Sequence, residues 1–320
     1  MTATTETPTS PSLAKVEALL RRPLLELVFE AASVHRQHHD PTKIQCSQLV
    51  SIKTGSCSED CGYCSQSAHN QTAVEREKLL SVPRVLDEAR KAKESGASRF
   101  CMGAAWRGVR NGKEFDSVLE MVRGVKDLGI EACVTLGMLN KEQADRLKEA
   151  GLDYYNHNLD TGRSHYEQVV TTRNYDDRLD TLQTVRDADI SVCCGGILGL
   201  GESISVRAEL LLQLAKLTPQ PDSIPVNRLV PVPGTPMGDL EEVPWQEWVA
   251  FIAATRILIP KTVIRLSAGR QEIPEAAQAM CFLAGANSIF VGDKLLTTPN
   301  PAPGTDAALL TSLGLSPTGE

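Results

Sequence analysis

Three closely spaced cysteines are the residues of this sequence best suited to chemistry. Cys57, Cys61 and Cys64 form a C-x3-C-x2-C pattern within a short stretch that contains glycine. Three thiolates on one loop could bind three irons of a 4Fe–4S cubane. Because the loop has no fourth cysteine, one iron would keep an open coordination position, which marks a reactive centre. The alternative is zinc or chance clustering, although a four-cysteine zinc site would normally need a second C-x2-C pair.

A second set of unusual residues lies within predicted β-strands. Cys101, Cys133 and the pair Cys193–Cys194 fall in apolar runs, and so does Arg265. A lone buried cysteine packs as a small hydrophobe, but a buried guanidinium is costly unless it meets an anion. Three cysteines and Arg265 could therefore converge on a second, smaller cluster. The alternative is that Arg265 pairs with a carboxylate and the cysteines only pack.

Polar residues gather near the ends of two predicted strands. Asn156, Asn158 and Asp160 alternate along the chain, so we expect them to face one side of their strand. Asn227 lies near the end of another strand. Because barrel enzymes bind ligands at the carboxyl ends of their strands, these residues are candidate ligand contacts. His157 lies between the asparagines and is expected to face the opposite side in a structural role.

The elements that must position these residues are short strands alternating with helices. The predicted strands cover residues 47–52, 98–103, 131–136, 152–158, 190–195, 222–229, 262–266 and 287–292. Between them the apolar period changes from two to 3.6. This alternation predicts a single catalytic domain with the (β/α)8 TIM-type barrel fold, an open doubly wound sheet being the competitor. The expected limits are an N-terminal arm with a leading helical segment over 1–43, the barrel over 44–300 and a C-terminal tail over 301–320.

Composition narrows the class of protein. The 320 residues carry a net charge of −7, which argues against nucleic acid or an anionic membrane as the main partner. No uninterrupted apolar run of about 18 residues is present. The polar residues 1–12 resemble no signal or transit peptide, so a reducing cytoplasm is expected. There, nine cysteines favour metal or redox chemistry over disulfides.

The cysteine loop resembles the signature of radical S-adenosylmethionine enzymes, with Tyr63 as the aromatic residue before the last cysteine. The Gly-x-Ile-x-Gly-x-x-Glu stretch at 195–202 is similar to their adenine-flanking element. Within that superfamily the chain looks most like the biotin synthase family, from about residue 44 to about 300. The stretches that carry this resemblance are 56–67, 100–107, 131–137, 155–161, 192–197 and 264–270.

The resemblance implies two iron–sulfur clusters. Their implied ligands are Cys57, Cys61 and Cys64 for a 4Fe–4S cluster, and Cys101, Cys133, Cys193 and Arg265 for a 2Fe–2S cluster. It also implies that S-adenosylmethionine chelates the open iron and that dethiobiotin binds nearby. The implied contacts are Tyr63 at the adenine, Asn158 and Asp160 near the ribose, Arg178 at the carboxylate, and Asn156 and Asn227 near dethiobiotin.

The activity implied by the resemblance is the conversion of dethiobiotin to biotin by a sulfurtransferase, the last step of biotin biosynthesis. A 5′-deoxyadenosyl radical would remove hydrogen, and sulfur would come from the 2Fe–2S cluster. Flavodoxin or ferredoxin as electron donor, cluster-assembly proteins and a homodimer are implied as well. Two other functions stay open at this stage: another radical enzyme of similar build, such as a maturase or mutase, and an iron–sulfur redox sensor without catalysis.

Overall fold

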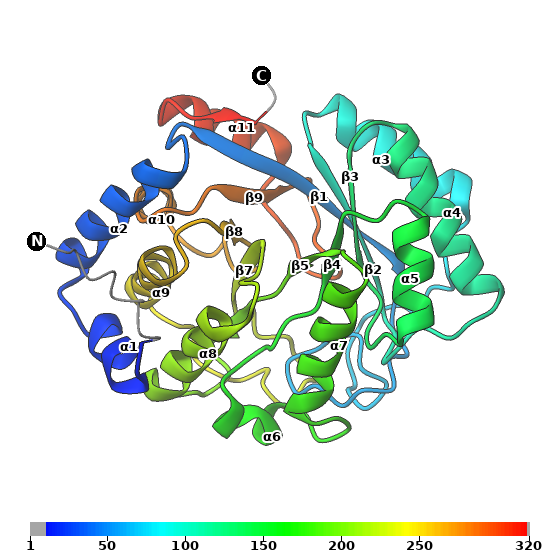
Figure 1. Cartoon of the computed structure of the whole chain (residues 1–320), viewed down its shortest axis with the longest axis horizontal. Coiled ribbons are helices and arrows are strands. Elements are labelled where there is room, and N and C mark those ends of the chain that lie inside the picture. Colours follow the sequence, from blue (N-terminus) through cyan, green and yellow to red (C-terminus); the bar gives the residue numbers. More distant parts are fainter. Residues whose placement is uncertain (1–10, 319–320) are drawn as a thin grey trace, which may run out of the picture.

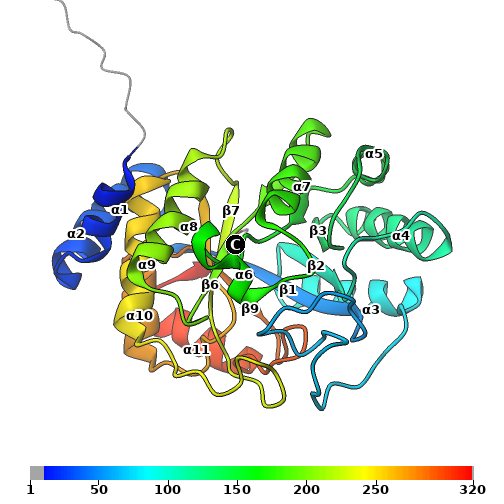
Figure 2. The ribbon, with the colours of Figure 1, turned by 90° about the horizontal axis from the view of Figure 1, so that it is seen from below.

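A closed barrel of parallel strands surrounded by helices forms the body of the molecule (Figures 1 and 2). The computed structural model describes residues 11–318. The barrel strands are β1 (Lys43–Lys53), β2 (Arg99–Ala104), β3 (Glu131–Thr135), β4 (Tyr154–Asn156), β5 (Ser191–Cys193), β7 (Ser223–Arg228), β8 (Val263–Leu266) and β9 (Ser288–Val291). Because β9 pairs with β1, the sheet has no open edge. The predicted (β/α)8 barrel is confirmed, and the open doubly wound sheet is excluded.

The helices predicted from apolar periodicity are present between the strands. They are α3 (Val82–Glu94), α4 (Lys113–Asp127), α5 (Lys141–Glu149), α8 (Ile204–Lys216) and α9 (Trp245–Leu258). Two more helices between strands are α7 (Tyr175–Asp187) and α10 (Glu275–Leu283). The side chains that α7 buries include a threonine as well as apolar residues, which weakens its periodic signal. A short turn, η1 (Arg163–His165), and α6 (Tyr166–Val169) precede α7.

The predicted strand over 190–195 is in fact two strands. After β5 the chain bends at Cys194 and Gly195 and continues as β6 (Gly196–Leu198), which pairs with β7. A Cβ atom on Gly195 would lie 2.0 Å from the carbonyl oxygen of Pro225. Only glycine therefore lets the chain pass so close to β7 at this bend.

The N-terminal segment packs against the helices that surround the barrel. The structure forms α1 (Leu13–Leu20) and α2 (Leu24–His38), which lie against α8 and α9 (Figure 1). Val16, Leu27 and Ala31 are completely buried in this contact. Within the arm and leading helical segment expected over 1–43, α1 and α2 form the helical part, and they bury an apolar face. The polar residues 1–10 of that arm lie outside the described residues.

The C-terminal segment also has regular structure. Residues 301–320 were expected to be a tail, but they contain α11 (Pro303–Ser312) and β10 (Ser316–Pro317), which pairs with the first residues of β1. An ion pair of 2.6 Å joins Asp306 on α11 to Arg270, and both side chains are almost fully buried. The segment is therefore an integral part of the packing. Among the described residues, no helix combines the length and apolar content that crossing a membrane requires.

The buried ion pair between Asp306 and Arg270 should contribute strongly to stability. Asp306→Asn leaves a buried guanidinium without its counter-charge, so we expect the free energy of unfolding to fall by about 3 kcal/mol. Urea denaturation of the apo-protein, followed by circular dichroism, measures this loss. The matched control is Asp87→Asn, which breaks an exposed ion pair with Arg90 and should leave the urea midpoint unchanged. An equal, small effect of both substitutions would contradict the prediction.

Candidate active site

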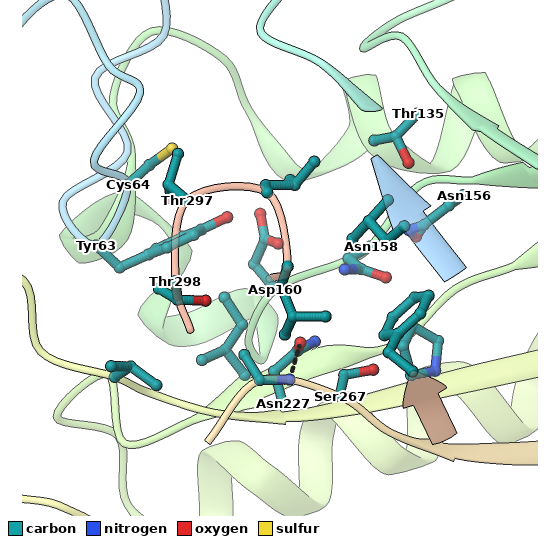
Figure 3. Close-up of a pocket in the computed structure, with 18 of the residues that line it drawn as sticks. Tyr63, Cys64, Thr135, Asn156, Asn158, Asp160, Asn227, Ser267, Thr297 and Thr298 are labelled. Atoms are coloured by element: carbon teal, nitrogen blue, oxygen red, sulfur yellow. Dashed lines mark hydrogen bonds between the residues drawn. The ribbon is translucent and has the colours of Figure 1, made fainter. Parts of the chain in front are cut away.

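One cavity of about 310 Å³ extends from the cysteine loop into the barrel interior (Figure 3). Its walls come from the loop after β1 and from residues on each of the strands β1 to β9. The predicted site residues that line it are Tyr63, Cys64, Cys101, Cys133, Asn156, Asn158, Asp160, Arg178, Cys193, Asn227 and Arg265. The barrel thus brings together residues that are up to two hundred positions apart in the sequence.

The loop that carries the three cysteines is held by its own backbone and by one asparagine. The Cys57 amide donates to the carbonyl oxygen of Gln66 at 3.0 Å. The side-chain nitrogen of Asn70 donates to the carbonyl oxygens of Cys61 and Cys64 at 3.1 and 2.8 Å. Of the three thiols, only that of Cys64 borders the cavity. The loop therefore carries its three cysteines on one short segment at the mouth of the barrel, although among the described residues no three His, Cys, Asp or Glu side chains lie close enough together to hold one metal ion.

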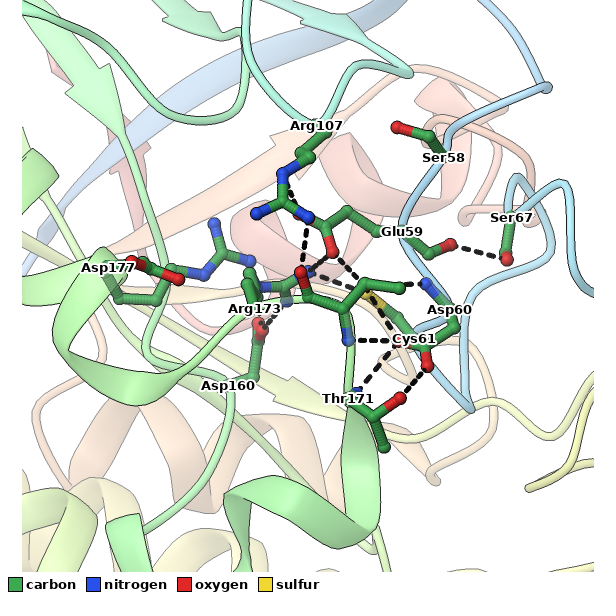
Figure 4. Close-up of polar contacts among 12 residues, drawn as sticks. Ser58, Glu59, Asp60, Cys61, Ser67, Arg107, Asp160, Thr171, Arg173 and Asp177 are labelled. Carbon is green, nitrogen blue, oxygen red and sulfur yellow. Dashed lines mark hydrogen bonds and ion pairs between the residues drawn. The ribbon is translucent and has the colours of Figure 1, made fainter.

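A buried arginine joins this loop to the opposite wall of the cavity. Arg173 Nη1 lies 3.1 Å from Cys61 Sγ and 3.3 Å from a carboxylate oxygen of Glu59 (Figure 4). Its Nη2 lies 3.1 Å from Asp160 Oδ2. The guanidinium is placed to compensate negative charge on the cysteines. Sequence reasoning missed Arg173, because it lies in the turn between α6 and α7, where no periodic pattern or motif marks it.

Burial keeps the loop thiols protonated in the absence of metal. It raises the pKa of Cys61 to about 11 and that of Cys64 to about 12. Arg173 opposes the shift at Cys61 but does not cancel it. Thiolates are the metal-binding form of cysteine, so loading a cluster here must release protons.

The turn that carries Arg173 is tied to the cysteine loop by Asp60. Its carboxylate accepts backbone hydrogen bonds from Thr171 at 2.9 Å and Thr172 at 3.1 Å (Figure 4). Although burial opposes the effect, hydrogen bonds from these two threonines hold the pKa of Asp60 well below its usual value. The charged Asp60 side chain therefore links the cysteine loop to the turn before α7 by hydrogen bonds.

Removing the charge of Arg173 should weaken cluster binding. Arg173→Met leaves Glu59 and Asp160 buried without their common cation, so we expect the affinity of the loop for its cluster to fall about tenfold. The measurement is iron bound per chain after anaerobic titration with iron and sulfide. Arg163→Met is the matched control, because Arg163 pairs with Asp176 at the surface of the same region. Wild-type iron binding by Arg173→Met would refute the role given to this residue.

Asp160 occupies an unusual backbone position at the cavity wall. Its φ angle is +66°, a left-handed conformation that costs a non-glycine residue about 1–2 kcal/mol. Its carboxylate accepts from Arg173 and also from Arg178, whose Nη2 lies 3.2 Å from Oδ2. Two guanidiniums thus hold one carboxylate beside the cavity, where the charge and the strained backbone indicate a binding role.

His157 does not face away from the cavity as the sequence suggested. Strand β4 ends at Asn156, so the strict alternation of sides stops there and His157 also lines the cavity. Arg178 Nη1 lies 3.2 Å from the imidazole nitrogens. Burial and the nearby charge of Arg178 lower the pKa of His157 well below its ordinary value. The imidazole is therefore neutral at physiological pH.

The three asparagines at the strand ends differ in their hydrogen bonds. Asn158 Oδ1 accepts from the Gly195 amide at 3.1 Å. Asn227 donates to the carbonyl oxygen of Gly196 and accepts from the Ala268 amide, which ties β6, β7 and the end of β8 together (Figure 3). Asn156 Oδ1 is buried and has no hydrogen-bond partner among the residues that the structure describes. Asn156 is thus the asparagine with an acceptor left free for a ligand.

The strand cysteines form one layer inside the barrel. Cys101 on β2 is the register partner of Cys133 on β3, so the two cysteines are neighbours across the sheet. Cys193 on β5 lines the same cavity. Cys194 does not line the cavity, because at the bend after β5 its side chain packs in the apolar core. This agrees with Cys193 rather than Cys194 as the residue that faces inward.

Arg265 lies at this layer beside Cys193 and neutral polar side chains. It is 1% exposed, and its guanidinium nitrogens donate to Ser288 Oγ at 3.0 Å, Gln45 Oε1 at 3.1 Å and Ser47 Oγ at 3.2 Å. Its Nη1 is 4.0 Å from Cys193 Sγ. Among the residues that the structure describes, no Asp or Glu pairs with it. A buried cation held only by neutral groups and facing thiols fits a cavity built for an anionic cluster.

A closed parallel barrel with a three-cysteine loop at the mouth of its central cavity defines the class of radical S-adenosylmethionine barrels. The Radical SAM superfamily model matches residues 51–214, and the Biotin and Thiamin Synthesis associated domain matches residues 225–316. The structure of methylornithine synthase superposes with a TM-score of 0.81 at 17% identity, over 97% of this chain and 95% of that chain. An FeFe-hydrogenase maturase from Carboxydothermus hydrogenoformans gives 0.80 at 18% identity, over 96% and 76%. These structures share the fold.

Relatives named biotin synthase are far more similar in sequence. The protein from Leptothrix cholodnii is 58% identical over 308 residues, which cover 96% of this chain and 89% of that protein. Those from Photobacterium profundum and Thiobacillus denitrificans are 57% and 58% identical over 95% of this chain and 87% and 96% of their own lengths. The chain belongs to the biotin synthase family.

Proposed function

We propose that this chain converts dethiobiotin to biotin as a radical S-adenosylmethionine sulfurtransferase. The observation that carries the proposal is one cavity with two sets of cysteines, Cys64 of the loop at its mouth and Cys101, Cys133 and Cys193 deeper in the barrel. The membership of the biotin synthase family supports the same activity. An enzyme that must form a radical and then deliver sulfur to the same substrate needs both sets on one cavity.

The cofactors are a 4Fe–4S cluster with S-adenosylmethionine and a 2Fe–2S cluster. When bound, they supply a 5′-deoxyadenosyl radical that removes hydrogen, and the sulfur that is inserted. As their holders we propose two sets of side chains. These are Cys57, Cys61 and Cys64 at the loop, and Cys101, Cys133, Cys193 and Arg265 in the barrel.

The cavity wall around Asp160 would orient S-adenosylmethionine. The Asp160 carboxylate, held by two arginines, is suited to accept hydrogen bonds from ribose hydroxyls, and Asn158 lies beside it. Arg178 offers a buried guanidinium for the carboxylate of the methionine part. The Tyr63 ring lies across the cavity mouth, where it can stack on the adenine (Figure 3).

Asn156 and Asn227 would position dethiobiotin between the two cysteine sets. The ureido ring of dethiobiotin carries N–H donors, and the unpartnered Asn156 Oδ1 is a buried acceptor on the cavity wall. Asn227, whose amide is already bonded to the backbone, would act through its position between β6 and β8. An unsatisfied acceptor costs about 1–3 kcal/mol, so a ligand that satisfies it gains specificity.

Apolar and hydroxyl side chains from the segment after β9 narrow the cavity mouth. Leu295 and Leu296 line the wall, and Thr297 Oγ1 lies 2.8 Å from Ser65 Oγ of the cysteine loop. Leu296 reaches Gly103 at the end of β2, where a Cβ atom would lie 2.6 Å from a Leu296 methyl carbon. These contacts keep water away from a reactive intermediate, which a radical reaction requires.

The proposal extends to partners. A one-electron donor such as flavodoxin or ferredoxin and the cluster-assembly proteins would supply electrons, iron and sulfide in the cytoplasm. A homodimer is the proposed assembly. Of the two other functions considered, a redox sensor has no use for an enclosed cavity with an unsatisfied acceptor. A maturase or mutase would not need a second cysteine set beside Arg265.

The test is anaerobic reconstitution with iron and isotopically labelled sulfide, followed by a single-turnover assay. We expect two spectroscopically distinct clusters per chain, 5′-deoxyadenosine that is formed only with dethiobiotin present, and labelled sulfur in the biotin product. A single cluster, bound zinc or unlabelled biotin would overturn the proposal. Mass spectrometry of the products and iron and sulfide counts give these results in one preparation.

A further inference from the structure

A second arginine lies directly below the strand cysteines. Arg99 precedes Cys101 by two positions on β2, so both side chains face the barrel interior. Its register partner on β3 is Glu131, just as Cys133 is the partner of Cys101. Arg99 and Glu131 therefore form the next layer toward the N-terminal end of the barrel. Arg99 is 1% exposed and is among the largest fully buried side chains.

The contacts of Arg99 leave one of its donor nitrogens unused. Its Nε lies 2.8 Å from a carboxylate oxygen of Glu131, and its guanidinium carbon lies 3.4 Å from the centre of the Tyr154 ring. Its Nη1 is buried, and within residues 11–318 it has no hydrogen-bond partner. A buried unpaired donor costs about 1–3 kcal/mol, and native structures rarely keep one without a use.

The strand cysteines are among the groups near Arg99, because Cys101 and Cys133 occupy the next layer of the same two strands. Besides Glu131 and Tyr154, the groups whose charge acts on Arg99 are the thiols of Cys133 and Cys101. Arg99 acts in turn on the thiol of Cys193. Glu131 cannot fully offset the guanidinium, because its side chain is 39% exposed and also accepts from Gln45. The unused donor and part of the positive charge are thus available to the cysteine layer.

We propose that Arg99 is a positioning residue of the second cluster site. Its Nη1 donates a hydrogen bond to the cysteine sulfurs, or to the cluster that they hold, from the N-terminal side. The inference rests on the proposed function, since it needs a cluster bound by Cys101, Cys133 and Cys193. Arg265 would then be the ligand and Arg99 the hydrogen-bond donor, so that two guanidiniums face one anionic group.

This arrangement has two consequences for the cluster. Hydrogen bonds and positive charge at the sulfurs stabilise the reduced state, so Arg99 raises the reduction potential of the site. They also hold the thiolates in place, and loss of such an outer contact typically lowers metal affinity about 10–100-fold. Neither consequence depends on the turnover of the enzyme.

The test compares three variants of the full chain after anaerobic reconstitution. Arg99→Met removes charge and donor, Arg99→Lys keeps the charge without the forked donor, and Glu131→Gln breaks the ion pair but keeps Arg99. For Arg99→Met we expect an affinity for the second cluster about tenfold lower and a more negative reduction potential, with the 4Fe–4S cluster unchanged. Arg99→Lys should fall between Arg99→Met and wild type, and Glu131→Gln should keep the wild-type affinity. Spectroelectrochemistry and iron titration give both values.

The controls separate this inference from the proposed function. Equal losses in Glu131→Gln and Arg99→Met would show that the ion pair is only structural and would overturn the inference, as would a wild-type potential in Arg99→Met. If Arg99→Met does not fold by circular dichroism, a wild-type potential in Arg99→Lys overturns it instead. A wild-type protein that binds no second cluster would refute the proposed function itself.

Discussion

Cys57→Ala is expected to abolish the 4Fe–4S cluster and, with it, both cleavage of S-adenosylmethionine and formation of biotin. The loop presents three thiols and no substitute, because the remaining cysteines lie outside it. Two thiolates cannot hold a cubane cluster against loss of iron. The expected result is an iron content reduced to that of the second cluster and 5′-deoxyadenosine at background level.

Cys281→Ala is the matched control for this prediction. Cys281 is completely buried in the apolar core, on α10. Its replacement removes a cysteine without touching the cavity, so both clusters and biotin formation should be retained. Iron and sulfide analysis together with product chromatography measures both variants. A Cys57→Ala protein that still cleaves S-adenosylmethionine would show that the loop is not the radical-generating site.

Cys133→Ala is expected to separate the two half-reactions. Cys133 lies in the middle layer of the barrel, beside Cys101 and away from the cysteine loop. Its loss should leave the 4Fe–4S cluster in place, so that 5′-deoxyadenosine is still formed in the presence of dethiobiotin. Biotin should fall to background, because the second cluster has lost a ligand and cannot deliver sulfur.

The neighbouring pair of cysteines offers a sharp control. Cys194→Ala removes a buried thiol that faces the core, next to Cys193, which lines the cavity. This variant should keep both products. Quantifying 5′-deoxyadenosine and biotin by mass spectrometry after one turnover decides the matter. If Cys194→Ala lost biotin, or if Cys133→Ala lost both products, the assignment of the two cysteine sets would be wrong.

Much of the site was visible in the sequence because its signals are local. The loop cysteines lie within eight residues, and their spacing alone indicates a shared metal group. The apolar runs around Cys101 and Cys133 are also local, so the sequence placed both cysteines within core strands, where they could converge with Arg265 on a second cluster. The strand count and the helices with a clear apolar face predicted the barrel for the same reason.

The predictions that failed applied a local sequence pattern at positions where tertiary packing decides the structure. His157 was placed on the outer side because the alternation was extended beyond Asn156, where β4 ends. Residues 301–320 were expected to be a tail, although Asp306 on α11 forms a buried ion pair with Arg270. The structure of short strands and chain ends depends on the residues that they pack against. The periodicity of their own sequence does not reveal those residues.

By itself, the sequence determined which residues can do chemistry: the thiols, the buried Arg265 and the alternating polar residues after 155. Only the tertiary structure decided which of them share a cavity, because β1 must pair with β9 before residues two hundred positions apart meet. The same closure places Arg173 against Cys61 and Arg99 beneath Cys101. Both arginines are buried, and a buried positive charge is costly unless a negative group lies beside it. An anionic cluster bound by the cysteines would supply that negative charge.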